Sequence, residues 1–285
     1  MISKPLRCGL LITFSLLFSS TVNATNGYFG HGYGTKNKGL SGGGVALPQD
    51  AMITATNPAG LTFVDERIEL GIDFFSPVRS YSNTPGTTLA DGTFCGAACP
   101  FTLGGVSTAQ NIDSENELFL IPHFAMNWIL NPQASVGLSL YGNGGMNTEY
   151  FGGQAQHNDG AGNLITNPGT FGAGTTGVNL EQLFVNATYA RKMTAKSSWG
   201  ISGIVAYQRF EATGLSNFGG FSTNPTNLTN TGTDDSYGFG LKLGIQGEVM
   251  TGLTLAASYQ SKIEKGEIDK KSAQYLSKSK ISILD

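Results

Sequence analysis

Alternation of apolar and polar residues with a period of two is the feature of this sequence that most restricts its fold. In residues 237–246, Tyr, Phe, Leu, Leu and Ile alternate with Gly, Gly, Lys, Gly and Gln. A period of two places successive side chains on opposite faces of a β-strand. The sequence therefore predicts an all-β fold of about seven strands. The six other segments with this pattern are 68–74, 120–128, 136–141, 183–189, 199–208 and 253–260.

The two faces of these segments favour a membrane barrel over a soluble sandwich. One face is continuously apolar, whereas the other consists mostly of Gly, Ser, Asn and Gln. A sandwich packs its apolar face against a second sheet, but a barrel in lipid turns small and polar residues into its lumen. Aromatic residues near strand ends are typical of the girdles of membrane barrels. Here they are Trp128, Tyr189, Trp199, Tyr207 and Tyr259.

Long and short connections alternate along the chain. This alternation is typical of outer-membrane barrels, whose long loops lie outside the cell and whose short turns lie in the periplasm. We therefore predict a transmembrane antiparallel β-barrel in the outer membrane of a Gram-negative bacterium. The long loops are predicted at about 81–116, 147–178 and 214–234, and the short turns at about 131–133, 194–197 and 250–252.

The composition excludes several other classes of protein. The 285 residues include 40 glycines and only 13% charged residues, which argues against an ordinary soluble enzyme and against a charged disordered chain. The formal net charge of −3 gives no electrostatic footprint for nucleic acid. No apolar run reaches the roughly 18 residues that a membrane-spanning helix needs.

Residues 1–24 are predicted to form a secretory signal peptide. Two positive residues precede a short apolar stretch, and Val22-Asn23-Ala24 offers a cleavage site. Export places the chain in an oxidising compartment, where Cys95 and Cys99 are expected to form a disulfide that stiffens a loop. We expect no metal site, because the three histidines are far apart in sequence.

The last part of the sequence departs from the strand pattern. Seven strands are an odd number, whereas single-chain bacterial barrels usually have an even number. From Lys262 the alternation fails and a run of charged residues reaches Lys271. We therefore expect residues 66–263 to form the first half of a barrel. Residues 264–285 are expected to be a charged tail that marks a truncation point.

Residues 25–65 carry no strand pattern and form a glycine-punctuated segment without the spacing of a phosphate-binding loop. This segment closely resembles the N-terminal hatch of the outer-membrane long-chain fatty acid transporters, the FadL/OmpP1/TodX family. The resemblance rests first on Asn26-Gly27-Tyr28-Phe29, His31 to Lys36, Gly44 to Ala51 and Asn57 to Gly60. It continues at 74–77, 121–124, 182–184, 206–210 and 258–263.

The resemblance implies a 14-stranded barrel plugged by the hatch, and passive transport of hydrophobic compounds, above all long-chain fatty acids. Ligand would be captured outside, the hatch would rearrange, and ligand would leave sideways into the membrane through a kinked third strand. Aromatic hydrocarbon uptake by the same mechanism, or a general porin or structural barrel, stays open as an alternative. The implied partners are a hydrophobic ligand, outer-membrane lipid and the barrel assembly machinery. Neither an enzyme nor a cofactor is implied, and no nucleophile–base constellation is discernible.

The resemblance also assigns roles to particular residues. Asn26, Gly27, Tyr28 and Phe29 would form the N-terminal gating segment. Asn57, Pro58 and Ala59 would form a hatch motif fixed against the barrel wall, the alternative being a plain Asn-Pro turn. Gly142, Gly144 and Gly145 would form the strand kink, because glycine inside a strand often marks a bulge. The alternative for these glycines is an ordinary strand end.

A fatty acid also brings a carboxylate, which needs hydrogen-bond donors or a cation. Alternation predicts that Lys242 faces the lumen, and Arg191 and Arg209 lie near strand ends. Each of the three is a candidate for binding the carboxylate. Each could instead be a solvated charge of the lumen or of the girdle.

Overall fold

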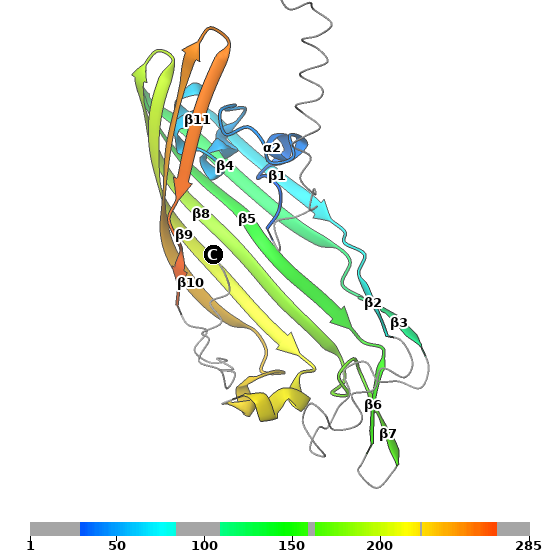
Figure 1. The fold of residues 1–285 in the computed structure, drawn as a ribbon. Helices are drawn as coiled ribbons and strands as arrows, with labels where there is room; N and C mark the ends of the chain where they lie inside the picture. Colours follow the sequence, from blue (N-terminus) through cyan, green and yellow to red (C-terminus); the bar gives the residue numbers. More distant parts are fainter. Residues whose placement is uncertain (1–28, 84–108, 159–162, 223, 267–285) are drawn as a thin grey trace, which may run out of the picture.

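A curved antiparallel sheet dominates the computed structural model, which describes residues 29–83, 109–158, 163–222 and 224–266 (Figure 1). Its strands follow the chain in the order β1-β4-β5-β8-β9-β10-β11. Each predicted segment lies in one of these strands, so the predicted all-β antiparallel fold is confirmed. The strands are β1 (Arg67–Phe75), β4 (Phe119–Asn131), β5 (Ala134–Tyr150), β8 (Thr176–Thr194), β9 (Ser197–Thr213), β10 (Asp234–Met250) and β11 (Leu253–Gln260).

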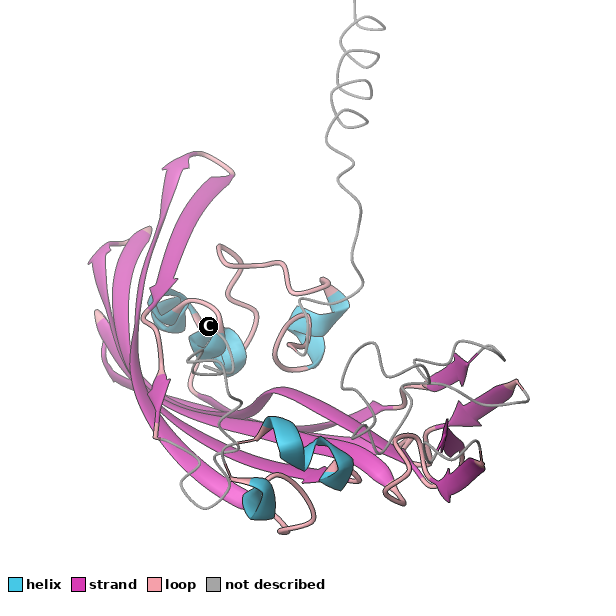
Figure 2. Ribbon diagram, turned by 60° about the horizontal axis from the view of Figure 1, so that its bottom comes forward, coloured by secondary structure: helices cyan, strands magenta, loops and turns pink. Residues whose placement is uncertain are grey.

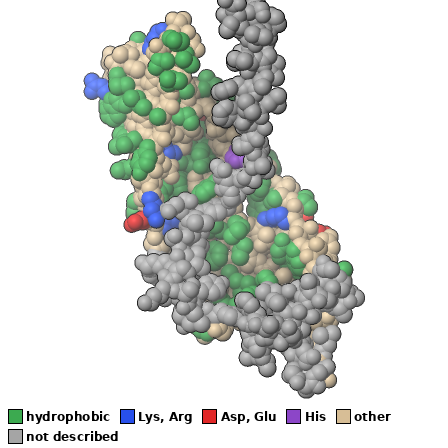
Figure 3. Space-filling model, viewed as in Figure 1, with side chains coloured by type: hydrophobic (Ala, Val, Ile, Leu, Met, Phe, Trp, Pro, Cys, Tyr) green, Lys and Arg blue, Asp and Glu red, His purple; other side chains and the backbone are tan. Residues whose placement is uncertain are grey.

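The alternation gives the sheet two different faces. In β10, Phe239 and Leu241 are exposed, whereas Ser236, Lys242 and Gln246 are buried on the inner face. Exposed apolar side chains in such a row match the lipid-facing band of a membrane barrel. Hydrophobic side chains gather accordingly along the β10–β11 side of the molecule (Figure 3).

Most of the strands are longer than the alternation predicts. β8 has 19 residues and β5 has 17, whereas about 9–11 residues suffice to cross a bilayer. Beyond the bilayer both faces of a strand meet water, so the apolar alternation fades while the backbone ladder continues. The predicted long loops therefore contain further elements, which lie at one end of the sheet (Figure 1). They are β2 (Ser80–Asn83), β3 (Gln110–Asp113), β6 (Gln154–Asn158), β7 (Leu164–Pro168), η4 (Ser216–Phe221) and η5 (Pro225–Asn227).

The predicted hatch residues form three short helices within the concave side of the sheet (Figure 2). These are α2 (Thr35–Gly39), η1 (Ala51–Ala55) and η2 (Pro58–Phe63). Asp50 caps η1 by accepting a hydrogen bond from the Met52 amide at 3.1 Å. Apolar hatch residues Ala51 and Met52 pack with inner-face residues of the sheet, including Tyr141 and Phe184. The core of the described molecule thus lies between hatch and sheet.

The two-residue strand β12 (Glu264–Lys265) pairs with β10 beyond the end of β11. Its residues lie opposite Gly238 and Phe239. β12 lies inside the segment predicted as a charged tail, so the sheet continues past the point where the apolar alternation fails. The apolar alternation gives no sign of this strand because both of its residues, Glu264 and Lys265, are charged and only backbone pairing defines it.

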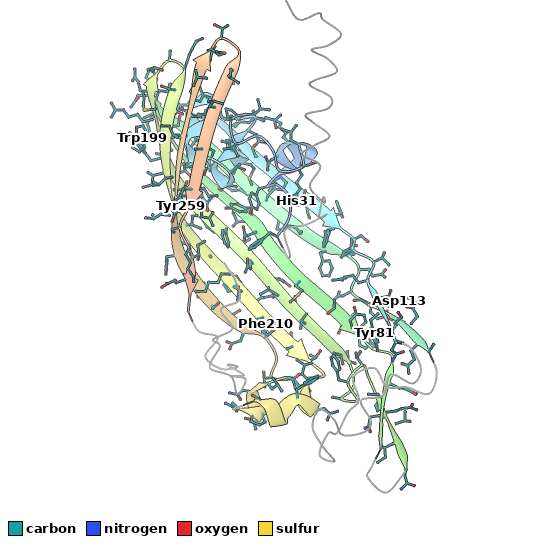
Figure 4. All side chains as sticks on the ribbon, viewed as in Figure 1. His31, Tyr81, Asp113, Trp199, Phe210 and Tyr259 are labelled. Atoms are coloured by element: carbon teal, nitrogen blue, oxygen red, sulfur yellow. The ribbon has the colours of Figure 1, made fainter. Side chains whose placement is uncertain are left out.

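Several predicted features lie outside the described residues. They are the signal peptide, Asn26, Gly27, Tyr28, the Cys95–Cys99 disulfide and residues 267–285. Within the described ranges, no helix combines the length and the hydropathy needed to cross a bilayer. The same residues hold no cluster of three or more His, Cys, Asp or Glu side chains suited to a metal ion. His31 lies in the hatch, far from Tyr81 and Asp113 on the paired strands β2 and β3 (Figure 4).

Candidate functional site

The Asn57-Pro58-Ala59 turn lies at the contact between hatch and sheet. Asn57 is fully buried, and its Oδ1 accepts a hydrogen bond from the Ala59 amide at 3.1 Å. Its Nδ2 donates to the Val45 carbonyl at 2.9 Å and approaches Oε1 of Gln246 on β10 at 3.4 Å. One side chain thus caps η2, ties two hatch segments together and reaches the sheet.

Polar side chains from five strands bind backbone carbonyls or hydroxyls of the hatch. A buried carbonyl without a partner costs about 1–3 kcal/mol, so these contacts fix the hatch in one position. Sequence reasoning singled out only Lys242 of this set and missed the other sheet residues, although each lies at an inward position of an alternating strand. The contacts are Asn127 Nδ2 to Val64 O (2.7 Å), Thr54 Oγ1 to Ser139 Oγ (2.9 Å), Asn186 Nδ2 to Thr54 O (3.3 Å), Ser198 Oγ to Ala59 O (2.7 Å) and Lys242 Nζ to Ala55 O.

Glycines of the sheet allow the hatch to approach this closely. A Cβ atom on Gly200 of β9 would lie 2.5 Å from the Pro58 carbonyl carbon and 2.7 Å from the Ala59 amide nitrogen. A Cβ atom on Gly244 of β10 would lie 2.0 Å from Asn57 Oδ1. All three separations are shorter than van der Waals contact. Glycine at these two positions is therefore part of the docking surface.

An irregularity interrupts β5 at the predicted kink. The register of β5 against β8 shifts between Gly142 and Gly144, so one extra residue, Asn143, is accommodated there. On its other side, the ladder between β4 and β5 runs only as far as the pair His123–Tyr141. From Gly142 onward, β5 therefore has a regular ladder on one side only.

The N-terminal segment lies against this irregularity. Phe29, the one gating candidate among the described residues, forms an isolated antiparallel bridge with Gly144. The Tyr33 hydroxyl donates to Oδ1 of Asn143 at 2.8 Å, and the ring centroids of Tyr33 and Tyr141 lie 4.4 Å apart. The structure thus brings together two groups of residues that the sequence analysis assigned separately.

A charged contact joins the hatch to the same part of the sheet. Lys38 Nζ on α2 lies 2.6 Å from Oδ2 of Asp73 on β1. Nδ1 of buried His123 lies 3.6 Å from the same oxygen. Together with Tyr33 and Gly142, these residues line a small cleft between hatch and sheet.

The three carboxylate candidates do not converge. Lys242 faces inward and is buried, and its Nζ donates to the hatch carbonyl of Ala55. Arg191 on β8 and Arg209 on β9 both lie at outward-facing positions of their strands. Arg209 forms an ion pair with Glu181 at 2.9 Å. Neither arginine faces the lumen, because alternation turns the neighbouring positions inward.

Alkaline pH should weaken the contact between Tyr33 and the β5 irregularity. Burial raises the pKa of the Tyr33 hydroxyl above its ordinary value of 10.0. The hydroxyl has its ordinary pKa of 10.0 when the N-terminal segment is undocked and a higher pKa when the segment is docked against β5. Above pH 10.0 the undocked form therefore loses its proton first, and docking becomes less stable as the pH rises. The difference in tyrosinate absorbance between wild type and Tyr33→Phe should titrate above that pH. A midpoint at or below it would contradict burial of the hydroxyl in solution.

The comparisons with known proteins agree with this architecture. The family described as outer membrane protein transport protein (OMPP1/FadL/TodX) matches residues 17–281. Two solved structures are similar in fold. One is the toluene transporter TbuX of Ralstonia pickettii, with 18% identity, a TM-score of 0.57 and coverage of 83% of this chain and 58% of that chain. The other is the monoaromatic hydrocarbon channel CymD, with 16% identity, a TM-score of 0.50 and coverage of 82% and 54%.

The chain therefore belongs to the outer-membrane transport protein family that includes FadL, OmpP1 and TodX. This confirms the resemblance and the predicted location in the outer membrane of Gram-negative bacteria. The chain spans little more than half the length of TbuX and CymD. No curated protein matches the sequence. Members of the family are transport channels rather than enzymes.

Proposed function

We propose that this protein takes up hydrophobic compounds across the outer membrane, with long-chain fatty acids as the preferred ligands. The observation that carries the proposal is the contact of Phe29 and Tyr33 with the irregular part of β5, where the β4–β5 ladder ends. An N-terminal segment placed where the β4–β5 ladder ends suits a ligand that must leave sideways once that segment is displaced.

The mechanism follows from the chemistry of such a ligand. An aliphatic chain gains roughly 0.8 kcal/mol for each CH₂ group that leaves water, so an apolar slot captures it from the outside. The hatch blocks an open aqueous path, and its displacement would uncover the apolar side chains of Tyr141 and Phe184 for the chain. Displacement of the N-terminal segment then frees the region around Gly142, Gly144 and Gly145. The ligand passes there into the membrane, whose lipid is a partner of the outer face.

Uptake by cells that lack their own fatty acid transporter tests this proposal. Cells expressing this protein at the surface should accumulate labelled oleate faster than cells with an empty vector. Deletion of Asn143 should restore a regular register to β5 and abolish the gain, because the irregularity disappears. The matched variant Asn143→Gln retains both the extra residue and an amide that can bind Tyr33 and Gln182, so it should keep uptake. Correct surface insertion without oleate uptake would refute fatty acid transport.

Aromatic hydrocarbons are the second candidate ligands, because TbuX is described as a toluene transporter and CymD as a monoaromatic hydrocarbon channel. Cells that accumulate labelled toluene but not oleate would favour this candidate. A general porin is the third candidate, and it requires an open lumen. A large steady ion conductance in planar bilayers would favour it over either form of hydrophobic uptake.

A further inference from the structure

A line of hydrogen-bonded polar side chains crosses the inner face of the sheet from the hatch to β12. Tyr33 donates to Asn143 Oδ1 at 2.8 Å, and Asn143 Nδ2 donates to Gln182 Oε1 at 3.2 Å. Gln182 Nε2 donates to Gln208 Oε1 at 2.8 Å, and Lys265 Nζ donates to the same oxygen at 2.6 Å. The line therefore begins at the N-terminal segment and ends at a cation.

Lys265 presents this cation to the lumen side. It lies opposite Gly238, an inward position of β10, and a Cβ atom on Gly238 would lie 2.9 Å from Lys265 Cγ. The side chain is partly buried. Among the described residues, no carboxylate lies within ion-pair distance of its Nζ. An ammonium group has three N–H donors, and the amide oxygen of Gln208 accepts from one of them. A carboxylate could accept from another by a charge-assisted hydrogen bond.

Apolar side chains lie next to this cation on the same face. Ile263, two residues before Lys265, packs against the buried cluster that contains Tyr141, Phe184 and Ile204. Gly240 leaves room for it, since a Cβ atom there would lie 2.7 Å from Ile263 Cγ1. Ile263 thus places a partly exposed apolar side chain beside the cation of Lys265, which is the pairing that an aliphatic carboxylate requires.

Lys242 is not available to bind a carboxylate in the same way. It lies on the inner face of β10 as well, but it is 5% exposed and its ammonium group is engaged with the hatch carbonyl of Ala55. A ligand would have to displace the hatch before it could reach Lys242. Lys265 is partly exposed with the hatch in place.

We propose that Lys265, with Gln208 beside it, binds the carboxylate of an aliphatic acid whose chain lies over Ile263. This inference rests on the proposed function and names the group that would distinguish a fatty acid from an uncharged hydrocarbon. Gln208 orients the ammonium through the bond to its Oε1, and Gln182 orients Gln208. The same line of hydrogen bonds connects Gln208, through Gln182 and Asn143, to Tyr33 at the β5 irregularity.

Binding of a matched pair of ligands to the purified 285-residue chain in detergent tests the proposal. Oleate carries the carboxylate, and oleyl alcohol has the same chain without the charge. Lys265→Met should weaken oleate binding by at least about tenfold, as expected for loss of a charge-assisted hydrogen bond, and leave oleyl alcohol binding unchanged. Lys265→Arg should keep the preference for oleate. Lys262→Met removes a neighbouring cation from the same segment and should leave both affinities unchanged.

The outcomes separate this inference from the proposed function. If wild type binds neither ligand, the proposed function fails. If wild type binds both and Lys265→Met lowers neither affinity, or lowers both equally, the assignment of Lys265 is wrong while hydrophobic binding stands. Heat-modifiable migration in gel electrophoresis shows whether Lys265→Met folds. If it does not fold, the salt dependence of ligand binding by the wild type tests the proposal instead. Oleate affinity should then fall with added salt while oleyl alcohol affinity does not, and equal behaviour would refute the proposal.

Discussion

Gly200→Val should detach the hatch from the sheet. The new Cβ would meet backbone atoms of Pro58 and Ala59, at 2.5 and 2.7 Å, and backbone cannot swing aside as a long side chain can. Overpacking typically costs about 1–3 kcal/mol, and a clash with backbone belongs at the upper end of that range. The bond from Ser198 Oγ to the Ala59 carbonyl would be lost with the docking. A shift of about 3 kcal/mol raises the population of undocked hatch roughly a hundredfold.

Trypsin provides the measurement, because Lys36 and Lys38 lie in the hatch helix α2. Cleavage at these lysines should accelerate in step with the undocked population when opening is fast relative to cleavage. Gly203→Val is the matched control on the same strand, since a Cβ atom at Gly203 meets nothing within 4 Å. It should leave the cleavage rate at the wild-type value. Equal rates for both variants would show that Gly200 does not carry the docking.

The strands are predictable from the sequence because lipid imposes an alternating pattern on them. Tyr237, Phe239 and Leu241 must be apolar to face hydrocarbon, and that requirement is visible residue by residue. The parts of β5 and β8 beyond the bilayer carry no such requirement, so their full length could not be predicted. The hairpins β2–β3 and β6–β7 are hidden for the same reason.

The site is predictable only where backbone geometry leaves a mark in the sequence. Gly142 and Gly144 mark the irregularity of β5, and the Asn57-Pro58-Ala59 turn marks the start of η2. The polar partners of the hatch could not be found in this way. Asn186 and Ser198 have the composition of any lumen-facing position, and only the folded hatch gives each of them a specific carbonyl to bind.

Lys242 and Lys265 illustrate the same limit. Alternation alone places Lys242 in the lumen, which is correct, but it cannot reveal that a hatch carbonyl occupies the ammonium group. Lys265 lies where the apolar pattern has already failed, so the sequence assigns it to a charged tail. Backbone pairing with Gly238 returns it to the lumen side. The periodicity of the sequence therefore cannot predict which residues pair across the sheet, and this pairing decides where Lys265 lies.

Asn57→Leu should produce the largest loss of hatch stability among substitutions that keep a side chain branched at Cγ. Leucine fills the buried space but leaves the Ala59 amide, the Val45 carbonyl and Gln246 Oε1 without their partner. Each unsatisfied buried group costs about 1–3 kcal/mol, so a total of about 3–5 kcal/mol is expected. Hydrogen exchange of the Ala59 amide should accelerate by at least about a hundredfold.

Asn57→Ser separates the two roles of this side chain. Serine can still accept the hydrogen bond from the Ala59 amide as a helix cap, but it is too short to donate to Val45 and Gln246. The capping contribution is about 1 kcal/mol, so Asn57→Ser should fall between wild type and Asn57→Leu. Asn111→Leu, at an exposed position of β3, is the control for the added hydrophobic surface. If Asn57→Ser exchanges as slowly as wild type, capping alone explains Asn57, and the hatch is held to the sheet by its other contacts.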